Sequence, residues 1–269
     1  MNTSKKHMPL ISIITPSYNS ADFIADAIES VLNQTYDQWE MIIVDDASTD
    51  NTVDIVETYV ARDDRISLIE LDKNSGSGVA RNKAIDAANG RFIAFLDSDD
   101  LWLPEKLEKQ IAFMLERDIA ISFTEYARMR EDGSLLKSNI TAPETIDYKG
   151  LLRHCVIGCL TVMIDMEKTG HIQMKNLRAR QDYVLWLSLT KRGFVAYGLP
   201  EELAVYRIVK NSISSNKFRM AKRNWHVYRK IEGQGVLKSI WYIILYAGHY
   251  VCRLLPKRRR HLRRKPDTE

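Results

Sequence analysis

The sequence predicts an α/β fold in which a Rossmann-like, mostly parallel central sheet is flanked by helices. Short apolar runs alternate with single amphipathic helical segments through the first hundred residues. The runs are apolar at successive positions, which is typical of strands buried on both faces, and single intervening helices are the usual crossovers of a parallel sheet. With 269 residues, 45% of them hydrophobic, the chain can form a large core.

The predicted elements follow one another in regular order. We expect strands at 11–15, 41–46, 65–71 and 91–97, separated by helices at 21–34, 52–63 and 77–90. Gly90 is the expected stop of the third helix. Beyond residue 130 the pattern is weaker, with a turn at 131–134, strands at 161–165 and 202–208, and a helix at 182–193. We expect these later elements to continue the same sheet and to complete a cleft.

Acidic residues gather where two of the apolar runs end. Asp45 and Asp46 follow the second run, and Asp97, Asp99 and Asp100 follow the fourth. Ligands of such sheets bind beyond the carboxyl ends of the strands, so these carboxylates are expected to converge on one edge. The D-x-D arrangement of Asp97 and Asp99 suits a hard divalent cation with oxygen ligands, which relieves the repulsion between two carboxylates. The sequence therefore predicts a site for Mn²⁺ or Mg²⁺.

Several other phosphate and metal motifs are absent. An EF-hand loop that began at Asp97 would have Leu101 and Trp102 at its fifth and sixth positions, where a ligand and a glycine are needed. The chain contains neither a P-loop nor a G-x-S-x-G motif. A D-x-D phosphotransferase is disfavoured because Thr15-Pro16-Ser17 stands after the first strand, where its nucleophilic aspartate belongs.

Positive charge is concentrated near the C-terminus. Residues 257–265 hold seven Lys or Arg, and the rest of the chain is nearly neutral, which argues against a nucleic-acid-binding face. The preceding segment, 236–255, is rich in aromatic residues, but its longest uncharged stretch is shorter than the ~20 residues that span a bilayer. We expect an amphipathic helical extension that binds an anionic membrane surface together with the basic tail. A core helix followed by a solvated tail is the alternative.

Two long segments resemble family 2 glycosyltransferases of the GT-A fold. They are SIITPSYNSADFIADAIESVLNQTYDQWEMIIVDDASTDNT at 12–52 and NSGSGVARNKAIDAANGRFIAFLDSDDLWLP at 74–104. The later RARQDYVLWLSLTKRG at 178–193 is similar to the branch that includes teichuronic-acid, capsule and O-antigen transferases. The resemblance implies an inverting transferase that moves a sugar from a nucleotide-sugar, UDP-hexose, to a lipid-linked saccharide in cell-surface polysaccharide synthesis.

The resemblance also implies roles for individual residues at the donor site. Pro16 and Tyr18 would hold the uracil ring, with the aromatic ring of Tyr18 stacking on the base. Asp99 would bind the divalent cation, together with Asp97, and Asp100 would be structural. The other residues that the resemblance places at the donor are Asp45, Asp46, Arg81, Asp97 and Ser98.

The catalytic base implied by the resemblance is Asp182, at the start of a late helix. Gln181 departs from the Glu that is commoner beside it in the family. From the residues alone, the preferred interpretation of Asp182 is the N-cap of the helix, because Asp is favoured there. Single displacement with this base would invert the anomeric configuration.

The resemblance divides the chain into a GT-A domain at 1–218 and a membrane-associating helical and basic segment at 219–269. Within the domain, the nucleotide-binding half is expected at 8–105 and the acceptor half at 106–218. Free cysteines indicate a reducing compartment, so we expect a cytoplasmic enzyme, peripheral on the inner face of a bacterial plasma membrane. The non-enzyme alternative is an inactive nucleotide-binding or assembly module. The sequence leaves the donor sugar, the acceptor hydroxyl and the oligomeric state open.

Overall fold

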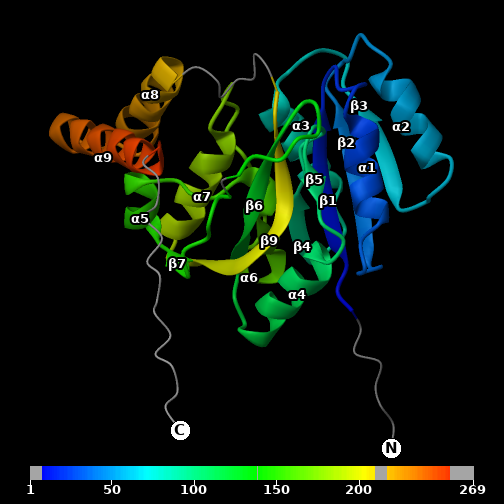
Figure 1. Ribbon diagram of the computed structural model, residues 1–269, viewed down its shortest axis with the longest axis horizontal. Coiled ribbons are helices and arrows are strands. Elements are labelled where there is room, and N and C mark those ends of the chain that lie inside the picture. Colours follow the sequence, from blue (N-terminus) through cyan, green and yellow to red (C-terminus); the bar gives the residue numbers. More distant parts are fainter. Residues whose placement is uncertain (1–7, 138, 210–216, 255–269) are drawn as a thin grey trace, which may run out of the picture.

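The computed structural model describes residues 8–137, 139–209 and 217–254 (Figure 1). A nine-stranded sheet runs through the described chain in the order β3-β2-β1-β4-β8-β6-β9-β5, and β7 pairs with β9. The strands are β1 (Ile11–Ser17), β2 (Trp39–Asp45), β3 (Ile66–Glu70), β4 (Phe92–Phe95), β5 (Leu101–Trp102), β6 (Ile121–Arg130), β7 (Thr145–Ile146), β8 (Met163–Asp165) and β9 (Ala196–Ile208).

Helices cover both faces of this sheet (Figure 1). They are α1 (Ile24–Leu32), α2 (Thr52–Val60), α3 (Ser77–Ala87), α4 (Lys106–Glu116), α5 (Tyr148–Arg153), α6 (Met166–Thr169), α7 (Gln181–Lys191), α8 (Lys217–His226) and α9 (Val236–Leu254), with a 3₁₀ turn at Cys159–Thr161 and a π-helical turn at Val227–Ile231.

The first half of the fold is the parallel unit that the sequence predicts. β1 pairs in parallel with β2 and β4, and β2 pairs in parallel with β3. Ile13 and Ile14 of β1 are fully buried in separate apolar clusters on the two faces of the sheet. One cluster includes residues of α1 and α4, and the other includes residues of α3 and α7. Burial on both faces explains why the strands are continuous apolar runs.

The second half departs from simple βα alternation. The short β8 follows α5 and the 3₁₀ turn, lies between β4 and β6 and is antiparallel to both. β6 then pairs in parallel with the long β9, and β5 lies antiparallel to β9. β9 begins at Ala196, six residues before the predicted strand at 202–208, and β6 has no counterpart in the predicted elements. The sheet is therefore mixed, with a mostly parallel centre.

Gly90 has a role other than the predicted helix stop. α3 ends at Ala87, and Ala88 after it is already extended. A Cβ at Gly90 would lie 2.6 Å from the Ser12 hydroxyl and 2.7 Å from the Ser12 backbone nitrogen. Glycine is required here because the chain passes against β1 as it enters β4, so the prediction of a C-terminal helix cap was wrong.

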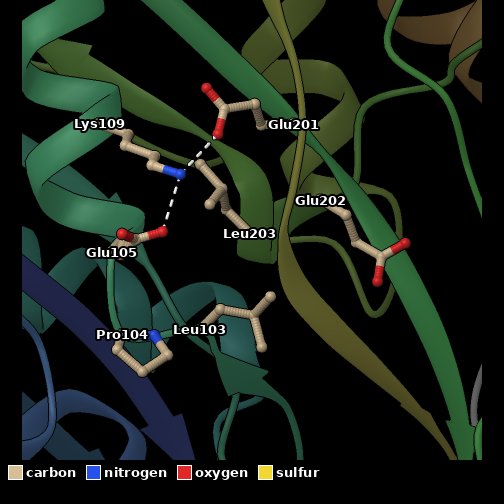
Figure 2. A pocket seen from close by; sticks show the side chains of 7 residues that line it. All are labelled: Leu103, Pro104, Glu105, Lys109, Glu201, Glu202 and Leu203. Carbon is tan, nitrogen blue, oxygen red and sulfur yellow. Dashed lines mark hydrogen bonds and ion pairs between the residues drawn. The ribbon is translucent and has the colours of Figure 1, made fainter.

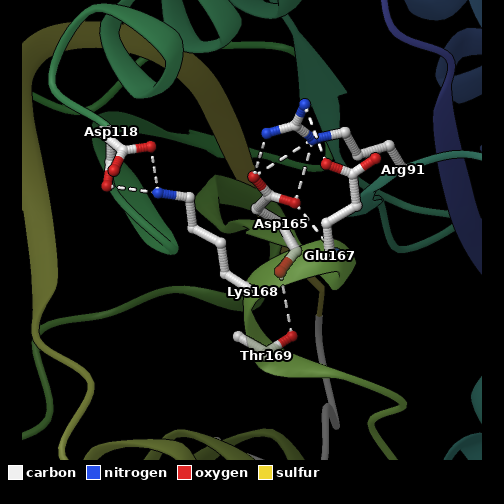
Figure 3. A network of polar contacts seen from close by, with 6 residues as sticks. All are labelled: Arg91, Asp118, Asp165, Glu167, Lys168 and Thr169. Atoms are coloured by element: carbon white, nitrogen blue, oxygen red, sulfur yellow. Dashed lines mark hydrogen bonds and ion pairs between the residues drawn. The ribbon is translucent and has the colours of Figure 1, made fainter.

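An ion-pair network connects the start of β4 to β8 (Figure 3). The Arg91 guanidinium is 2.6 Å from Asp165 and 3.0 Å from Glu167. Asp165 is buried, and its carboxylate also accepts the Glu167 backbone N–H at 3.0 Å. Lys168 pairs with Asp118 beside this cluster. Since the predicted acids follow the carboxyl ends of the parallel strands, this network stabilises the sheet at the opposite end.

The C-terminal helices form the amphipathic extension that the sequence predicts. Val227 and Tyr228 are buried in the cluster that contains α7, and the ring of Tyr242 on α9 lies 5.5 Å from that of Tyr228. On α9, Leu237 and Trp241 remain exposed. None of the described helices combines the length and apolarity needed to cross a bilayer. The basic run 257–265 lies outside the described residues, and the division at residue 218 stays a prediction.

Candidate active site

The turns after β1 and β2 meet through the Asp45 carboxylate. The Ser17 hydroxyl donates to Asp45 Oδ1 at 2.9 Å, and Ser48 donates to the same carboxylate from its backbone N–H at 2.7 Å and its hydroxyl at 2.6 Å. The Asn19 backbone N–H donates in turn to the Ser48 hydroxyl at 2.9 Å. Asp45 is buried. Its carboxylate therefore holds the two turns together, and the predicted contact with the donor stays a prediction.

Asp46 fixes the loop that opens α3. Its two carboxylate oxygens accept the backbone N–H groups of Ser75 at 2.6 Å and Gly76 at 2.7 Å. Gly76 has φ = 95°, a conformation that other residues rarely adopt, so a glycine is needed at this position. Asp46 thus orients the segment that carries Arg81 into the site. The predicted contact of Asp46 with the donor stays a prediction.

Pro16 and Tyr18 lie where β1 ends, as predicted. Pro16 is buried within β1 opposite Val44 of β2, whereas Tyr18 is 47% exposed. An exposed aromatic ring at the carboxyl edge of the sheet is available for stacking on a planar base. The donor roles of both residues stay predictions.

Arg81 and Asp97 form an ion pair at the centre of this edge. The Arg81 Nη2 lies 2.5 Å from Asp97 Oδ1, with the Arg81 side chain buried and that of Asp97 29% exposed. Burial disfavours the charge of Arg81, but the Asp97 carboxylate, with smaller contributions from Cys159 and Asp182, outweighs it and raises the pKa of the guanidinium above its ordinary value. The predicted neighbours Arg81, Asp97 and Asp182 therefore lie in one electrostatic environment.

Arg207, a residue that the sequence did not single out, organises the acidic loop. Its backbone N–H donates to Asp100 Oδ1 at 2.9 Å, and its Nε donates to the Asp99 carbonyl at 2.9 Å. Its Nη2 is 2.8 Å from Asp26. Asp100 has the structural contact that was predicted, since its carboxylate holds the backbone of β9. In the sequence, Arg207 stands out only as the single basic residue of the mostly apolar run 202–208.

Ser98 and Asp99 complete the loop. The Ser98 hydroxyl is buried 2.7 Å from that of Ser20, so Ser98 joins this loop to the β1 turn. Burial, followed by the charge of Asp97, raises the pKa of Asp99 to about 6. A cation would remove this repulsion.

The described residues contain no group of three or more His, Cys, Asp or Glu side chains placed to hold a metal. Mg²⁺ and Mn²⁺ need only one or two carboxylates when substrate phosphates supply further oxygens, and the assignment of Asp99 and Asp97 to such an ion stays a prediction.

Asp182 lies in the first turn of α7 and does not cap it. The N-cap position is occupied by Arg180, which has the left-handed φ of 70°, and no side chain caps the helix. Asp182 is half-buried and makes no hydrogen bond among the described residues. Its charge acts on Arg81 and Arg180. The carboxylate is thus held near the Arg81–Asp97 pair without a structural partner, which suits a general base.

Gln181 and Arg180 position the start of α7. The Gln181 Nε2 donates to the Ser77 hydroxyl at the start of α3 at 2.6 Å, and Gln181 is buried. An uncharged amide can make this bond inside the protein without bringing another charge beside Asp182. Arg180 donates to the hydroxyl of Tyr246 on α9 at 2.8 Å. Local sequence patterns do not reveal the Arg180 contact, because its partner is 66 residues away.

A separate cavity of about 480 Å³ lies between the start of α4 and β9 (Figure 2). Lys109 points between Glu105 and Glu201 and is 2.8 Å from each. Lys109 thus pairs with two of the three glutamates in the lining, and none of the predicted site residues lines the cavity. It is therefore a structural ion-pair cluster.

Comparison with known proteins agrees with this geometry. Residues 12–166 match the family described as glycosyl transferase family 2. The chain is 55% identical to TuaG of Bacillus subtilis, a putative teichuronic acid biosynthesis glycosyltransferase, over 92% of this chain and 98% of the relative. It is 40% identical to WfgD of Escherichia coli, a UDP-Glc:alpha-D-GlcNAc-diphosphoundecaprenol beta-1,3-glucosyltransferase, over 88% of this chain and 92% of the relative.

Solved structures share the fold at low identity. TarS 1–349 of S. aureus in complex with UDP-GlcNAc has a TM-score of 0.66 at 20% identity, covering 91% of this chain and 72% of that chain. The mannosyltransferase PcManGT from Pyrobaculum calidifontis, in complex with GDP-Man and Mn²⁺, has a TM-score of 0.66 at 17% identity, covering 93% and 76%. The fold is GT-A, as the resemblance implied. This chain belongs to glycosyl transferase family 2, in the branch that contains the teichuronic-acid transferase.

Proposed function

We propose that this glycosyltransferase moves a hexose from a UDP-sugar to a saccharide carried on a lipid diphosphate, with inversion at the anomeric carbon. The observation that carries the proposal is Asp182, a half-buried carboxylate in the first turn of α7 that caps no helix and has no hydrogen-bond partner among the described residues. The similarity to WfgD, whose name specifies a UDP-glucose donor and a diphosphoundecaprenol-linked acceptor, supports the substrate classes.

The chemical step is a single displacement. Asp182 takes the proton of the acceptor hydroxyl while that oxygen forms a bond to the anomeric carbon. The bond from this carbon to the phosphate oxygen breaks, and UDP departs with the electron pair. Inversion follows because the acceptor attacks opposite the leaving group. A general base in this position contributes roughly 10²–10⁴-fold to the rate.

The donor half of the site binds the nucleotide. Tyr18 stacks on the uracil, and Asp45 and Asp46 shape the turns around it. A divalent cation held by Asp99 and Asp97 would offset the negative charge of the diphosphate. Arg81 holds Asp97 in place for this task.

The protein acts at a membrane surface through α9. Leu237, Trp241 and Ile244 are exposed on this helix at positions that share one face. An apolar face of this kind lies in the interface between headgroups and acyl chains. Membrane attachment would bring the enzyme to a lipid-linked acceptor.

A UDP-release assay tests the proposed function. The purified protein is offered a panel of UDP-, GDP- and dTDP-sugars with Mn²⁺ and with GlcNAc-diphosphoundecaprenol as acceptor. We expect UDP release that depends on the acceptor and is lost in EDTA, with a product of inverted anomeric configuration by NMR. Nucleotide binding without release under every condition would support an inactive binding module and overturn the proposal.

A further inference from the structure

A basic pocket lies between the segment that leads into α7 and the helix α8. It is a cavity of about 310 Å³. Its charged lining residues are all basic: Arg178, Arg219, Lys222, Arg223 and His226. Leu177, Ala179 and Val227 supply the apolar part of the lining.

Two of these cations have no counter-charge. Lys222 and Arg178 are exposed, and neither makes a hydrogen bond or an ion pair within the part of the chain that the structure describes. Like charges that converge on a concave surface repel one another and attract an anion. A guanidinium and an ammonium group together suit phosphate oxygens, because Arg binds them with a planar fork and Lys as a point charge.

The pocket adjoins the proposed catalytic base. Ala179 in its lining is three residues before Asp182, so their Cα atoms are at most ~11 Å apart. Asp182 in turn acts on Arg81, which pairs with Asp97. The base is thus close to the acidic donor loop and close to a basic pocket that the donor mechanism does not use.

The exposed apolar face of α9 belongs to the same part of the molecule. α8, which lines the pocket, packs against α9 (Figure 1). α9 exposes Leu237, Trp241 and Ile244. A ligand with a phosphate head and a long apolar chain can therefore place its head in the pocket while its chain remains at the membrane.

We infer that the basic pocket binds the diphosphate of the lipid-linked acceptor and so presents the acceptor hydroxyl to Asp182. The inference rests on the proposed function, and it assigns the acceptor half of the site. A flat basic patch would serve general attraction to an anionic membrane, whereas a cavity bounded by cations from two segments can enclose a single headgroup. In an acceptor whose first sugar is joined to the diphosphate, one sugar ring separates the diphosphate from the reacting hydroxyl. This separation is compatible with the short distance from Ala179 in the pocket lining to Asp182.

Two single variants, Arg178→Ala and Lys222→Ala, and their combination test the inference. Each change removes one charge-assisted contact and should raise the KM for the lipid-linked acceptor roughly tenfold, with the KM for the donor and the affinity for UDP unchanged. Lys222→Arg should restore the acceptor KM. Lys230→Ala is the matched control, because Lys230 is exposed on the adjoining turn outside the pocket.

Binding to vesicles identifies the ligand without turnover. The wild-type protein should bind phosphatidylcholine vesicles that contain undecaprenyl diphosphate. Its binding should be weaker to phosphatidylcholine vesicles of equal net charge in which phosphatidylglycerol is the anionic lipid. The double variant should lose this preference. Inorganic pyrophosphate should compete weakly, because it lacks the lipid chain. Equal binding to both vesicles, or an unchanged preference in the double variant, would overturn the inference.

Failure of the inference can be told apart from failure of the proposed function. If the wild-type protein transfers sugar and the pocket variants keep its acceptor KM, the pocket is not the acceptor site and the function stands. If no nucleotide-sugar supports transfer, the proposed function fails, and the vesicle preference still reports on the pocket.

Discussion

The guanidinium of Arg180 donates a hydrogen bond of 2.8 Å to the hydroxyl of Tyr246, which joins the C-terminal helix α9 to the residue two positions before Asp182. Arg180 is half-buried, and its buried Nε has no hydrogen-bond partner among the residues that the structure describes. Its left-handed backbone at φ = 70° is held in place by these surroundings. The position of the proposed base thus depends on a helix that lies outside the sheet.

Removing that hydroxyl tests the dependence. Tyr246→Phe leaves a second donor of Arg180 unpaired, so we expect a loss of about 1–3 kcal/mol in the free energy of unfolding and a lower kcat. The affinity for UDP should not change. Urea unfolding, steady-state kinetics and calorimetry measure these quantities. Tyr242→Phe is the control on the same helix, since Tyr242 packs on Tyr228 through its ring. A normal kcat in Tyr246→Phe would show that α9 does not position the base.

The role of Asp182 is tested by Asp182→Asn. The amide keeps the shape of the side chain and cannot accept the proton, so kcat should fall roughly 10²–10⁴-fold. Because Asp182 makes no hydrogen bond within the described residues, the melting temperature and the UDP affinity should stay at wild-type values. Ser188→Ala on the exposed side of α7 serves as control. Normal turnover in Asp182→Asn would refute the assignment.

The Arg81–Asp97 pair gives a prediction about stability. Arg81→Met removes a buried cation, and since Asp97 is partly exposed, the loss in the free energy of unfolding should be about 2–3 kcal/mol. Asp97→Asn should cost more, because it leaves the buried guanidinium of Arg81 without its counter-charge. A double-mutant cycle measured by urea unfolding should give a coupling energy of about 1 kcal/mol or more. Additive effects of the two substitutions would mean that the ion pair contributes nothing.

Lys106 makes the stability depend on pH. It is fully buried with its ammonium over the Trp102 ring, and burial lowers its pKa from 10.5 to about 7. The unfolded chain therefore binds a proton between pH 7 and 10.5 that the folded chain does not. Lys106 therefore lowers the free energy of unfolding. This loss is fully present below pH 7 and disappears as the pH rises toward 10.5.

This effect is measured as a difference from Lys106→Met. The free energy of unfolding of the wild-type protein, relative to that of the variant, should rise by roughly 2 kcal/mol between pH 7 and pH 9. Parallel urea titrations at several pH values give the difference, so contributions from other groups cancel. A difference that does not change with pH would mean that Lys106 stays charged in the folded protein.

Membrane attachment is tested on the exposed face of α9. Leu237→Glu and Trp241→Glu place charges on a face where both side chains are mostly solvent-exposed, so the melting temperature should change little. Flotation with anionic vesicles should fall sharply. Leu115→Glu is the matched control, because Leu115 is an exposed leucine on α4. Wild-type flotation of the α9 variants would show that this face is not the membrane contact.

The sequence by itself determined the parallel half of the fold and the edge where the site lies. Strands such as β1 and β2 are buried on both faces, so each is a continuous apolar run, and the amphipathic helices between them leave only parallel pairing. The acids after β2 and β4 were readable because strand ends are local features. The family resemblance added Asp182 as the base, whereas the residues alone favoured a helix cap at this position.

The tertiary structure decided what depends on residues far apart in the chain. The local hydrophobic pattern does not indicate that β8 runs antiparallel beside β4. It also does not indicate that Gly90 lies against Ser12 instead of ending a helix. The contact of Arg180 with Tyr246 and the basic pocket between residue 178 and α8 are likewise invisible in the sequence. Hydrophobic patterns record which side of an element is buried, and only packing determines which distant side chain it meets.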